Sequence, residues 1–366
     1  MNRPITSLDS YRLLGRSGLR VSPLCLGTMT FGSEWGWGAD EATSEAIFRA
    51  YAERGGNFID TANFYTEGTS ERIIGRCIAN DRDRFVLSTK YTLNMRHGDP
   101  NAGGNHRKSL TQAVEASLKR LGTDYIDLYW VHAWEYRTPI EEVMRALDDL
   151  VRQGKVLYLG ASDFPAWKVA EANTLAELMG WSRFIGLQVE YNLVQRDSER
   201  DLVPMAAELG LGVMPWSPLA GGLLTGKYTR NDIERQRHAS ESGELLAFGG
   251  QQRLLLPSER QLAIADAVRE IAEELACAPA QVALGWLLTR PTVTCPIVGA
   301  RYLAQLEDNL GALDVPFSDG QLARLDRLSR VELGFPHDFI TSQFVNENVT
   351  GGARIPPQRV AVRAGS

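Results

Sequence analysis

The sequence predicts an α/β protein folded as a (β/α)8 TIM barrel, and three observations favour this fold class. Eight short β-rich runs alternate with longer segments of helical periodicity, which is the pattern of a parallel sheet joined by helices. No G-x-G-x-x-G motif follows the first run, so the chain lacks the signature of a doubly wound dinucleotide-binding sheet. The 366 residues would allow two domains, but a single barrel with insertions accommodates them, since such barrels span roughly 200 to 400 residues.

Each expected strand is a short apolar run bounded by turn-forming residues. The eight runs are Leu24–Gly27, Asn57–Asp60, Phe85–Thr89, Tyr125–Val131, Val156–Ala161, Gly186–Glu190, Gly212–Pro215 and Val293–Pro296. Between them, apolar residues recur at i, i+4 and i+7, as in Val114, Leu118 and Leu121, which predicts amphipathic helices. Pro139 and Pro165 follow strands at positions typical of a helix start.

Three segments fall outside these repeating units. The stretch "YRLLGRSGLRVSPL", residues 11–24, predicts an N-terminal β-hairpin that caps the bottom of the barrel. Residues 229–256 form a long loop after strand seven, long enough to suggest a functional lid. From about residue 340 no strong pattern remains, so we expect a barrel domain over residues 1–340 and a mobile tail over 341–366.

The composition disfavours several classes of partner. Lys and Arg number 39 against 45 Asp and Glu, and the net charge of −6 comes without a basic stripe that could neutralise nucleic-acid phosphates. The N-terminus has no apolar signal region, and no segment approaches the roughly 20 apolar residues that span a bilayer. We therefore expect a cytoplasmic protein with small-molecule substrates and neither a nucleic-acid nor a membrane partner; the oligomeric state stays open.

Metal chemistry is also disfavoured. The cysteines are far apart and form no C-x-x-C pair, and the histidines form neither H-x-x-x-H nor H-E-x-x-H. These residues are Cys25, Cys77, Cys277 and Cys295, and His97, His106, His132, His238 and His337. We expect buried thiols and a mechanism without a metal ion.

One stretch, "PWSPLAGGLLTGKYTRND" at residues 215–232, raises the question of nucleotide binding. Gly221, Gly226 and Lys227 have the spacing of a Walker A loop. Tyr228, however, stands where that motif needs a Ser or Thr hydroxyl for Mg²⁺, so an ATPase or kinase is disfavoured. A surface turn permitted by the glycines is the other interpretation of this stretch.

Polar residues gather at the ends of three adjacent strands. Asp60 ends the second strand, Tyr65 lies five residues later, Lys90 follows the third strand and His132 follows the fourth. Singly, Asp60 could be a turn former, Lys90 a solvated charge and His132 a structural histidine. Barrel enzymes place catalytic groups at the C-terminal ends of their strands, so these four side chains should converge on one rim.

These segments resemble the aldo-keto reductase superfamily. The resemblance rests on "GGNFIDTANFYTEGTSERIIG", "VLSTKY", "DLYWVH", "GLQVEYN", "WSPLAGGLLTGKY" and "VGARYLAQLEDNL", in order over roughly residues 11–330. "GASDFPAW", residues 160–167, resembles the aryl-alcohol dehydrogenase and potassium-channel β-subunit-like branch. The resemblance implies that Asp60, Tyr65, Lys90 and His132 are a catalytic tetrad.

In the implied reaction a carbonyl accepts hydride from NADPH while Tyr65 donates a proton. We expect Lys90 to lower the pKa of Tyr65 from the phenol value of about 10, because a nearby cation favours the phenolate. Asp60 would hold the Lys90 ammonium, and His132 would donate a hydrogen bond to the carbonyl oxygen.

The resemblance also implies the cofactor contacts. Trp216 would stack on the nicotinamide, the loop with Gly221 and Lys227 would fold over the pyrophosphate, and Arg301 would meet the 2′-phosphate of NADPH. Ser162, Asp163 and Gln188 would bind the carboxamide, although an ionised Asp163 could only accept hydrogen bonds. The full set is Gly27, Thr28, Met29, Asp60, Ser162, Asp163, Gln188, Trp216, Ser217, Pro218, Leu219, Gly221, Leu223, Lys227, Gly299, Arg301, Gln305, Asp308 and Asn309.

Aromatic side chains in the predicted rim loops indicate aromatic or bulky apolar carbonyl substrates. The expected pocket residues are Phe31, Trp35, Phe64 and Trp134, with Trp37 nearby; Trp35 and Trp37 could instead fold back onto the barrel. A second hypothesis is a regulatory module that holds NADPH as a redox sensor with little turnover. A third, a sugar isomerase, is disfavoured because the expected metal-binding carboxylates and histidine are missing.

Overall fold

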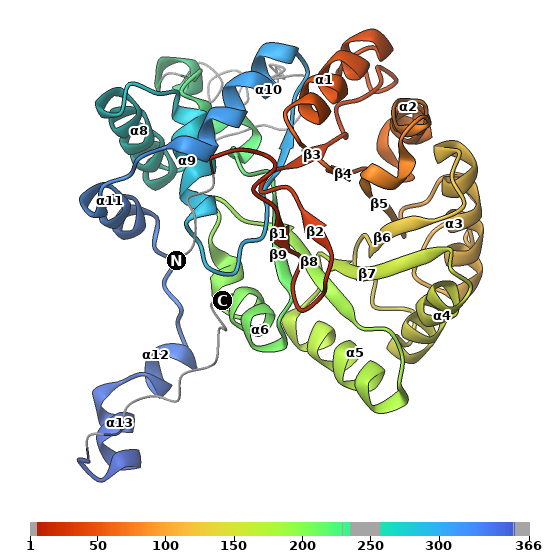
Figure 1. Cartoon of the computed structure of the whole chain (residues 1–366). Helices are drawn as coiled ribbons and strands as arrows, with labels where there is room; N and C mark the ends of the chain where they lie inside the picture. Colours follow the sequence, from red (N-terminus) through yellow and green to blue (C-terminus); the bar gives the residue numbers. More distant parts are fainter. Residues whose placement is uncertain (1–5, 229, 235–256, 354, 356–366) are drawn as a thin grey trace.

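The computed structural model describes residues 6–228, 230–234, 257–353 and 355. Its strands are β1 Arg12–Leu13, β2 Arg20–Val21, β3 Cys25–Gly27, β4 Phe58–Asp60, β5 Val86–Tyr91, β6 Ile126–Val131, β7 Val156–Ser162, β8 Phe184–Glu190, β9 Gly212–Trp216 and β10 Ile297–Gly299. Eight of them form a nearly closed parallel barrel in the order β10-β3-β4-β5-β6-β7-β8-β9 (Figure 1). The predicted (β/α)8 fold class is confirmed.

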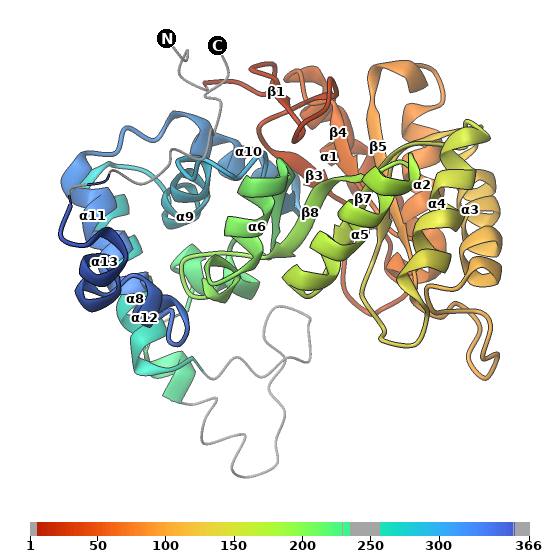
Figure 2. The same ribbon diagram turned by 90° about the horizontal axis from the view of Figure 1, so that it is seen from below.

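Helices alternate with the strands around the barrel. The α-helices are α1 Glu41–Glu53, α2 Thr69–Ile78, α3 Arg107–Leu121, α4 Ile140–Arg152, α5 Ala166–Met179, α6 Leu202–Leu209, α8 Glu259–Glu274, α9 Pro279–Leu288, α10 Leu303–Leu310, α11 Asp319–Ser329, α12 His337–Ile340 and α13 Gln343–Thr350. Short 3-10 turns are η1 Tyr65–Gly68, η2 Arg82–Arg84, η3 Asp197–Glu199, η4 Ala220–Thr225 and η5 Gly311–Asp314. As predicted, Pro139 and Pro165 stand directly before α4 and α5. The second view shows α2 to α5 lined along one side of the barrel (Figure 2).

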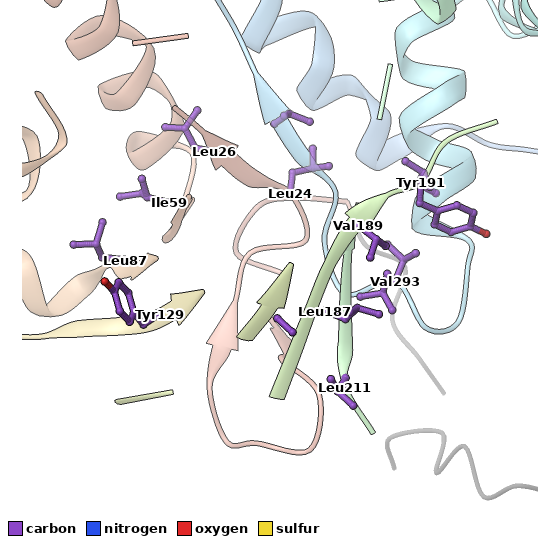
Figure 3. Packing of buried hydrophobic residues seen from close by; sticks show 14 of the residues in the cluster. Leu24, Leu26, Ile59, Leu87, Tyr129, Leu187, Val189, Tyr191, Leu211 and Val293 are labelled. Atoms are coloured by element: carbon purple, nitrogen blue, oxygen red, sulfur yellow. The ribbon is translucent and has the colours of Figure 1, made fainter. Parts of the chain in front are cut away.

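The strands divide their side chains between two hydrophobic layers, because successive residues of a strand point to opposite faces. Outward-facing residues such as Leu26, Ile59, Leu87 and Tyr129 follow one another from β3 to β6 and pack in the large cluster shared with the helices (Figure 3). Inward-facing residues, including Trp130, form a second cluster inside the barrel. A functional side chain at a strand end therefore points into or out of the barrel together with the apolar residue two positions before it.

The barrel interior is filled at its centre by Trp130 of β6. A Cβ atom added to Gly160 of β7 would lie 2.2 Å from the Trp130 ring, and one added to Gly186 of β8 would lie 2.8 Å from it. The two glycines thus make the space that this indole occupies. The interior is a packed core, so ligands can enter only at its ends.

The N-terminal hairpin closes the bottom of the barrel, as predicted. Strands β1 and β2 pair antiparallel, and Leu14 and Val21 are fully buried in the interior cluster. The Arg12 guanidinium donates to the carbonyl oxygens of Val293 and Thr294, each at 3.0 Å. The other end of the barrel is left for the loops that follow the strands.

Each predicted strand differs from the structure at one or both ends, and two of these differences matter here. The eighth strand is β10, which begins after Pro296; the predicted run before it meets β9 only through a bridge between Val213 and Val293 and the bond from Thr294 N to Val213 O. Pro296 carries no N–H and cannot donate to a ladder, which explains the late start. Lys90, expected just past its strand, lies within β5.

The end of the chain carries two helices that the pattern did not predict. Helices α12 and α13 project from the ring in Figure 1 and lie on the side of α8 and α11 in Figure 2. Residues 354 and 356–366 of the predicted mobile tail lie outside the described residues. The same is true of the suggested lid, 229–256, apart from residues 230–234.

Within the described ranges, no single helix is long and apolar enough to cross a membrane. Helices α8 and α9 reach the required length and apolar composition only when taken together, and they are bent by 99° relative to each other.

Candidate active site

Lys90 is the centre of a buried polar cluster at the carboxyl end of the barrel. Its ammonium Nζ lies 2.5 Å from Asp60 Oδ2, 2.9 Å from the carbonyl oxygen of Thr61 and 3.0 Å from the Tyr65 hydroxyl. The Lys90 side chain is fully buried and that of Asp60 is 2% exposed. The structure thus brings together three of the four residues predicted to form a catalytic tetrad.

The strand pattern explains why these groups meet. Phe58 and Asp60 share a face of β4, and Val86 and Lys90 share a face of β5. Because Phe58 and Val86 belong to the cluster inside the barrel, Asp60 and Lys90 must also point inward. Strands β4 and β5 are hydrogen-bonded neighbours, which places the carboxylate beside the ammonium.

The second carboxylate oxygen of Asp60 is held from β5 and from β8. Oδ1 accepts a hydrogen bond of 2.8 Å from Ser88 Oγ and one of 3.1 Å from Gln188 Nε2. One N–H of the Gln188 amide, a residue predicted to bind the nicotinamide carboxamide, therefore contacts Asp60, which leaves its second N–H and its oxygen for a ligand. Ser88 was missed in the sequence, although its position two residues before Lys90 puts it on the same strand face.

His132, the fourth predicted residue, faces Tyr65 from the end of β6. The two rings meet edge to face, with centroids 5.9 Å apart. Burial, assisted by the charge of Lys90, lowers the pKa of His132 to about 3, so its imidazole is neutral at physiological pH. Its Nδ1 is buried without a hydrogen-bond partner among the described residues. A neutral imidazole beside a phenol can donate one hydrogen bond to a ligand.

The expected lowering of the Tyr65 pKa is wrong. Burial raises the pKa of this phenol, and the opposing attraction of Lys90 is too weak to reverse the shift. Burial lowers the pKa of Lys90, but Asp60 and Tyr65 outweigh it, so that pKa is raised. Both groups hold their protons at neutral pH. The error arose because the sequence reveals the nearby cation but not how completely the ring is desolvated.

The predicted carboxamide site lies across β7, β8 and β9. Ser162, at the end of β7, is buried and pairs in register with Gln188 of β8. Trp216, at the end of β9, donates its indole N–H to Asp163 Oδ1 at 3.0 Å. Asp163 and Ser217 both adopt left-handed backbone conformations, with φ of 51° and 50°.

The predicted phosphate loop follows β9 and turns sharply. Ala220, Gly221 and Gly222 all have positive φ, which brings backbone groups to the surface of the turn. The Lys227 Nζ lies against Gly222, 2.8 Å from where a Cβ atom would be, and the φ of 97° at Gly222 favours glycine at this position. The Leu223 side chain packs into a small hydrophobic cluster, which leaves only its backbone for a cofactor. Pro218 is buried and Leu219 is partly buried.

The predicted adenosine end lies where β10 leads into α10. Gly299 ends β10, and the backbone N–H of Arg301 donates to Gln305 Oε1 at 2.8 Å. Asn309, one helical turn beyond Gln305, is 5% exposed. Asp308 accepts hydrogen bonds from the Gln281 side chain of α9. This contact directs the Asp308 carboxylate toward α9.

Most residues at the end of β3 and just after it hold neighbouring strand ends together. Thr28 is fully buried, and its hydroxyl donates to the carbonyl oxygen of Asp60 at 3.1 Å. The Thr30 hydroxyl donates to the carbonyl oxygen of Ala300 at 2.7 Å, which ties this loop to the end of β10. Gly27 is buried and Met29 is partly exposed. Met29 is therefore the member of this group that a ligand can reach.

The predicted substrate pocket separates into two aromatic groups. Trp35 contacts Trp37 and Phe64, with ring centroids 5.6 and 5.9 Å apart, and Phe64 is 38% exposed beside Tyr65. Trp134 is 9% exposed and packs on Phe164 at 5.2 Å. A correction applies to Phe31, which is fully buried in the layer between strands and helices and so belongs to the core; Trp134 is a member of the same core cluster.

Among the residues that the structure describes, no group of three or more His, Cys, Asp or Glu side chains is arranged to hold a metal ion. The cysteines are all free. Cys25 and Cys295 are buried as expected, whereas Cys77 and Cys277 are partly exposed.

Comparison with known proteins matches residues 23–330 to the aldo/keto reductase family. The chain is 39% identical to an aryl-alcohol dehydrogenase [NADP(+)] of Phanerodontia chrysosporium, over 91% of this chain and 89% of that protein. It is 38% identical to norsolorinic acid reductase A of Aspergillus parasiticus, over 92% and 85% of the two chains. It is 35% identical to a putative aryl-alcohol dehydrogenase of Saccharomyces cerevisiae, over 92% and 91%. The protein belongs to the aldo/keto reductase family.

Proposed function

We propose that this protein is an NADPH-dependent reductase of aromatic or bulky apolar aldehydes and ketones, with Tyr65 as the proton donor. The observation that carries the proposal is the buried Lys90 ammonium, which contacts the Tyr65 hydroxyl on one side and the Asp60 carboxylate on the other. Family membership supports carbonyl reduction, and the NADP(+) in one relative's name supports the choice of cofactor. The reverse reaction, alcohol oxidation, uses the same groups.

Three features of the rim fit a dinucleotide cofactor. The left-handed turn at Ala220–Gly222 leaves room for the Lys227 ammonium beside exposed backbone. Trp216 offers a flat indole at the end of β9. Arg301, which follows β10, supplies a cation suited to the 2′-phosphate of NADPH. When bound, the nicotinamide supplies the hydride.

The proton comes from Tyr65 in this proposal. A raised pKa keeps the phenol protonated at neutral pH, as a general acid requires. When the carbonyl oxygen takes the proton, the phenolate left behind lies 3.0 Å from the Lys90 ammonium, which stabilises it. Asp60 holds that ammonium in place, with its other oxygen fixed by Ser88 and Gln188.

His132 orients the substrate. Because its imidazole is neutral, it can donate a hydrogen bond to the carbonyl oxygen without competing with Tyr65 as an acid. The exposed Phe64, which precedes Tyr65 in the chain and contacts Trp35, offers an aromatic surface to a substrate. Such a surface favours aromatic substrates over sugars, whose hydroxyls need polar partners.

The regulatory-module hypothesis predicts tight NADPH binding with little turnover. The test is steady-state NADPH oxidation by the full chain, measured with a panel of benzaldehydes, aryl ketones and short sugars. Sustained turnover with the aromatic aldehydes supports the reductase. Stoichiometric NADPH binding without turnover on any member of the panel would favour the regulatory module. The cytoplasmic location remains a prediction from the sequence.

A further inference from the structure

The turn that carries Tyr65 has an unfavourable backbone conformation. Thr66, Glu67 and Gly68 follow one another with φ of 45°, 56° and 85°. Side chains other than glycine rarely adopt this left-handed region, and a β-branched residue such as Thr is an outlier there. Such a conformation persists only when the surrounding structure fixes it. The contacts of Thr66 show what fixes this one.

The Thr66 hydroxyl joins two neighbouring segments. It donates to the carbonyl oxygen of Phe31 at 2.7 Å and accepts from the backbone N–H of Ser70 at 3.1 Å. Thr66 is fully buried, and a Cβ atom on Gly32 would lie 2.8 Å from its hydroxyl oxygen. The loop after β3 is therefore packed directly against the turn. One hydroxyl links this loop, the turn and the first residues of α2.

The same network reaches the Lys90 ammonium. The Ser70 hydroxyl donates to the carbonyl oxygen of Thr28 at 2.7 Å and lies 2.9 Å from the Thr61 hydroxyl. The carbonyl oxygen of Thr61 in turn accepts from Lys90 Nζ. The start of α2 is thus anchored to the residues that hold the proposed proton donor.

We propose that Thr66 is a positioning residue for proton transfer. Its hydroxyl locks the left-handed turn and so holds the Tyr65 phenol against Lys90. Thr66 itself is fully buried, so it acts through Tyr65 rather than on a ligand. The inference rests on the proposed function, in which Tyr65 supplies the proton.

Three variants distinguish the effect of the Thr66 hydroxyl from the effect of the side-chain shape. Thr66→Val keeps the shape and removes the hydroxyl, whereas Thr66→Ser keeps the hydroxyl. Thr66→Gly removes the hydroxyl and relieves the left-handed strain. We expect kcat to fall about 10- to 100-fold in the Val and Gly variants, since displacing a catalytic group by about 1 Å has effects of that size. The Ser variant should stay within about twofold of the wild type, and all three should bind NADPH with wild-type Kd.

The decisive measurement is the effect of Thr66→Val on the residual turnover of the Tyr65→Phe protein. If Thr66 acts through the phenol, Thr66→Val causes no further loss of the residual turnover, because the group that it positions is already gone. A general structural defect would reduce turnover by the same factor in both backgrounds. Should Thr66→Val fail to fold, Thr66→Gly carries the same comparison, because glycine adopts this backbone freely.

Two results would overturn the inference: wild-type kcat in both Thr66→Val and Thr66→Gly, or equal losses with and without the phenol. If instead the proposed function is wrong, the Tyr65→Phe variant itself retains wild-type turnover.

Discussion

Trp216 donates its indole N–H to the Asp163 carboxylate at 3.0 Å, joining the end of β9 to the turn after β7. The indole N–H can only donate and an ionised carboxylate can only accept, so each supplies what the other lacks. This bond fixes the orientation of the side chain that we propose stacks on the nicotinamide. It also gives Asp163 a role beyond the predicted carboxamide contact.

The first prediction concerns the titration of Asp163. Burial raises the pKa of this carboxyl to about 6, against the opposing hydrogen bond from Trp216 and the charge of Lys90. The unfolded value is near 4, so the folded state binds this proton more tightly, and the contribution of Asp163 to stability falls as pH rises from about 4 through 6. Asp163→Asn keeps an acceptor oxygen and does not ionise. Its Tm relative to the wild type should therefore be higher at pH 7.5 than at pH 4.5. A Tm difference that does not change with pH would show that Asp163 titrates normally.

The second prediction concerns the buried ion pair. Lys90→Met leaves the Asp60 carboxylate buried without its cation, which typically costs about 3–5 kcal/mol of unfolding free energy. The matched control is Lys155→Met, which breaks the surface pair with Glu115 and should cost about 0–1 kcal/mol. Urea denaturation of both variants measures the difference. Equal stability losses would mean that the Lys90 site is hydrated in solution.

The third prediction concerns cofactor choice. Arg301→Ala should weaken NADPH binding by about 10- to 100-fold, since a hydrogen bond to a charged group contributes about 1.5–3 kcal/mol. NADH, which has no 2′-phosphate, should bind nearly as before. Arg327→Ala on α11 is the control and should change neither affinity. If Arg301→Ala weakens the binding of NADPH and NADH equally, Arg301 does not bind the 2′-phosphate.

The fourth prediction concerns substrate preference. Phe64 is exposed beside Tyr65, so Phe64→Ala should lower kcat/KM for a benzaldehyde more than for a short aliphatic aldehyde. Phe339→Ala, at an exposed phenylalanine of α12, is the matched control and should affect neither substrate. If Phe64→Ala leaves the ratio of the two kcat/KM values unchanged, the aromatic wall lies elsewhere.

The barrel could be predicted because most residues of its strands are buried, so that the strands read as short apolar runs between turns. The same alternation that buries Phe58 and Val86 points Asp60 and Lys90 inward, so the strand ends also revealed the centre of the candidate site. The eighth strand was misplaced because the apolar run before Pro296 looks like a strand, although only the residues after it pair with β3.

Other features depend on tertiary geometry that no local pattern contains. The bond between Gln188 and Asp60 joins residues 128 positions apart, and Ser70 reaches Thr28 through the packing of α2 against the barrel. The pKa of Tyr65 depends on a balance between burial and charge, which requires both to be known. Helix α13 has no buried residues, so it lacks the apolar stripe that reveals a helix packed on a core.

The most direct test of the account is the turnover of Tyr65→Phe with saturating NADPH and a benzaldehyde. The substitution keeps the ring and removes only the hydroxyl that lies 3.0 Å from Lys90. General acid catalysis typically contributes about 10²- to 10⁴-fold, so kcat should fall by at least that lower factor while NADPH binds with wild-type affinity. A variant that reduces the aldehyde at the wild-type rate would contradict the assignment of Tyr65 as the proton donor.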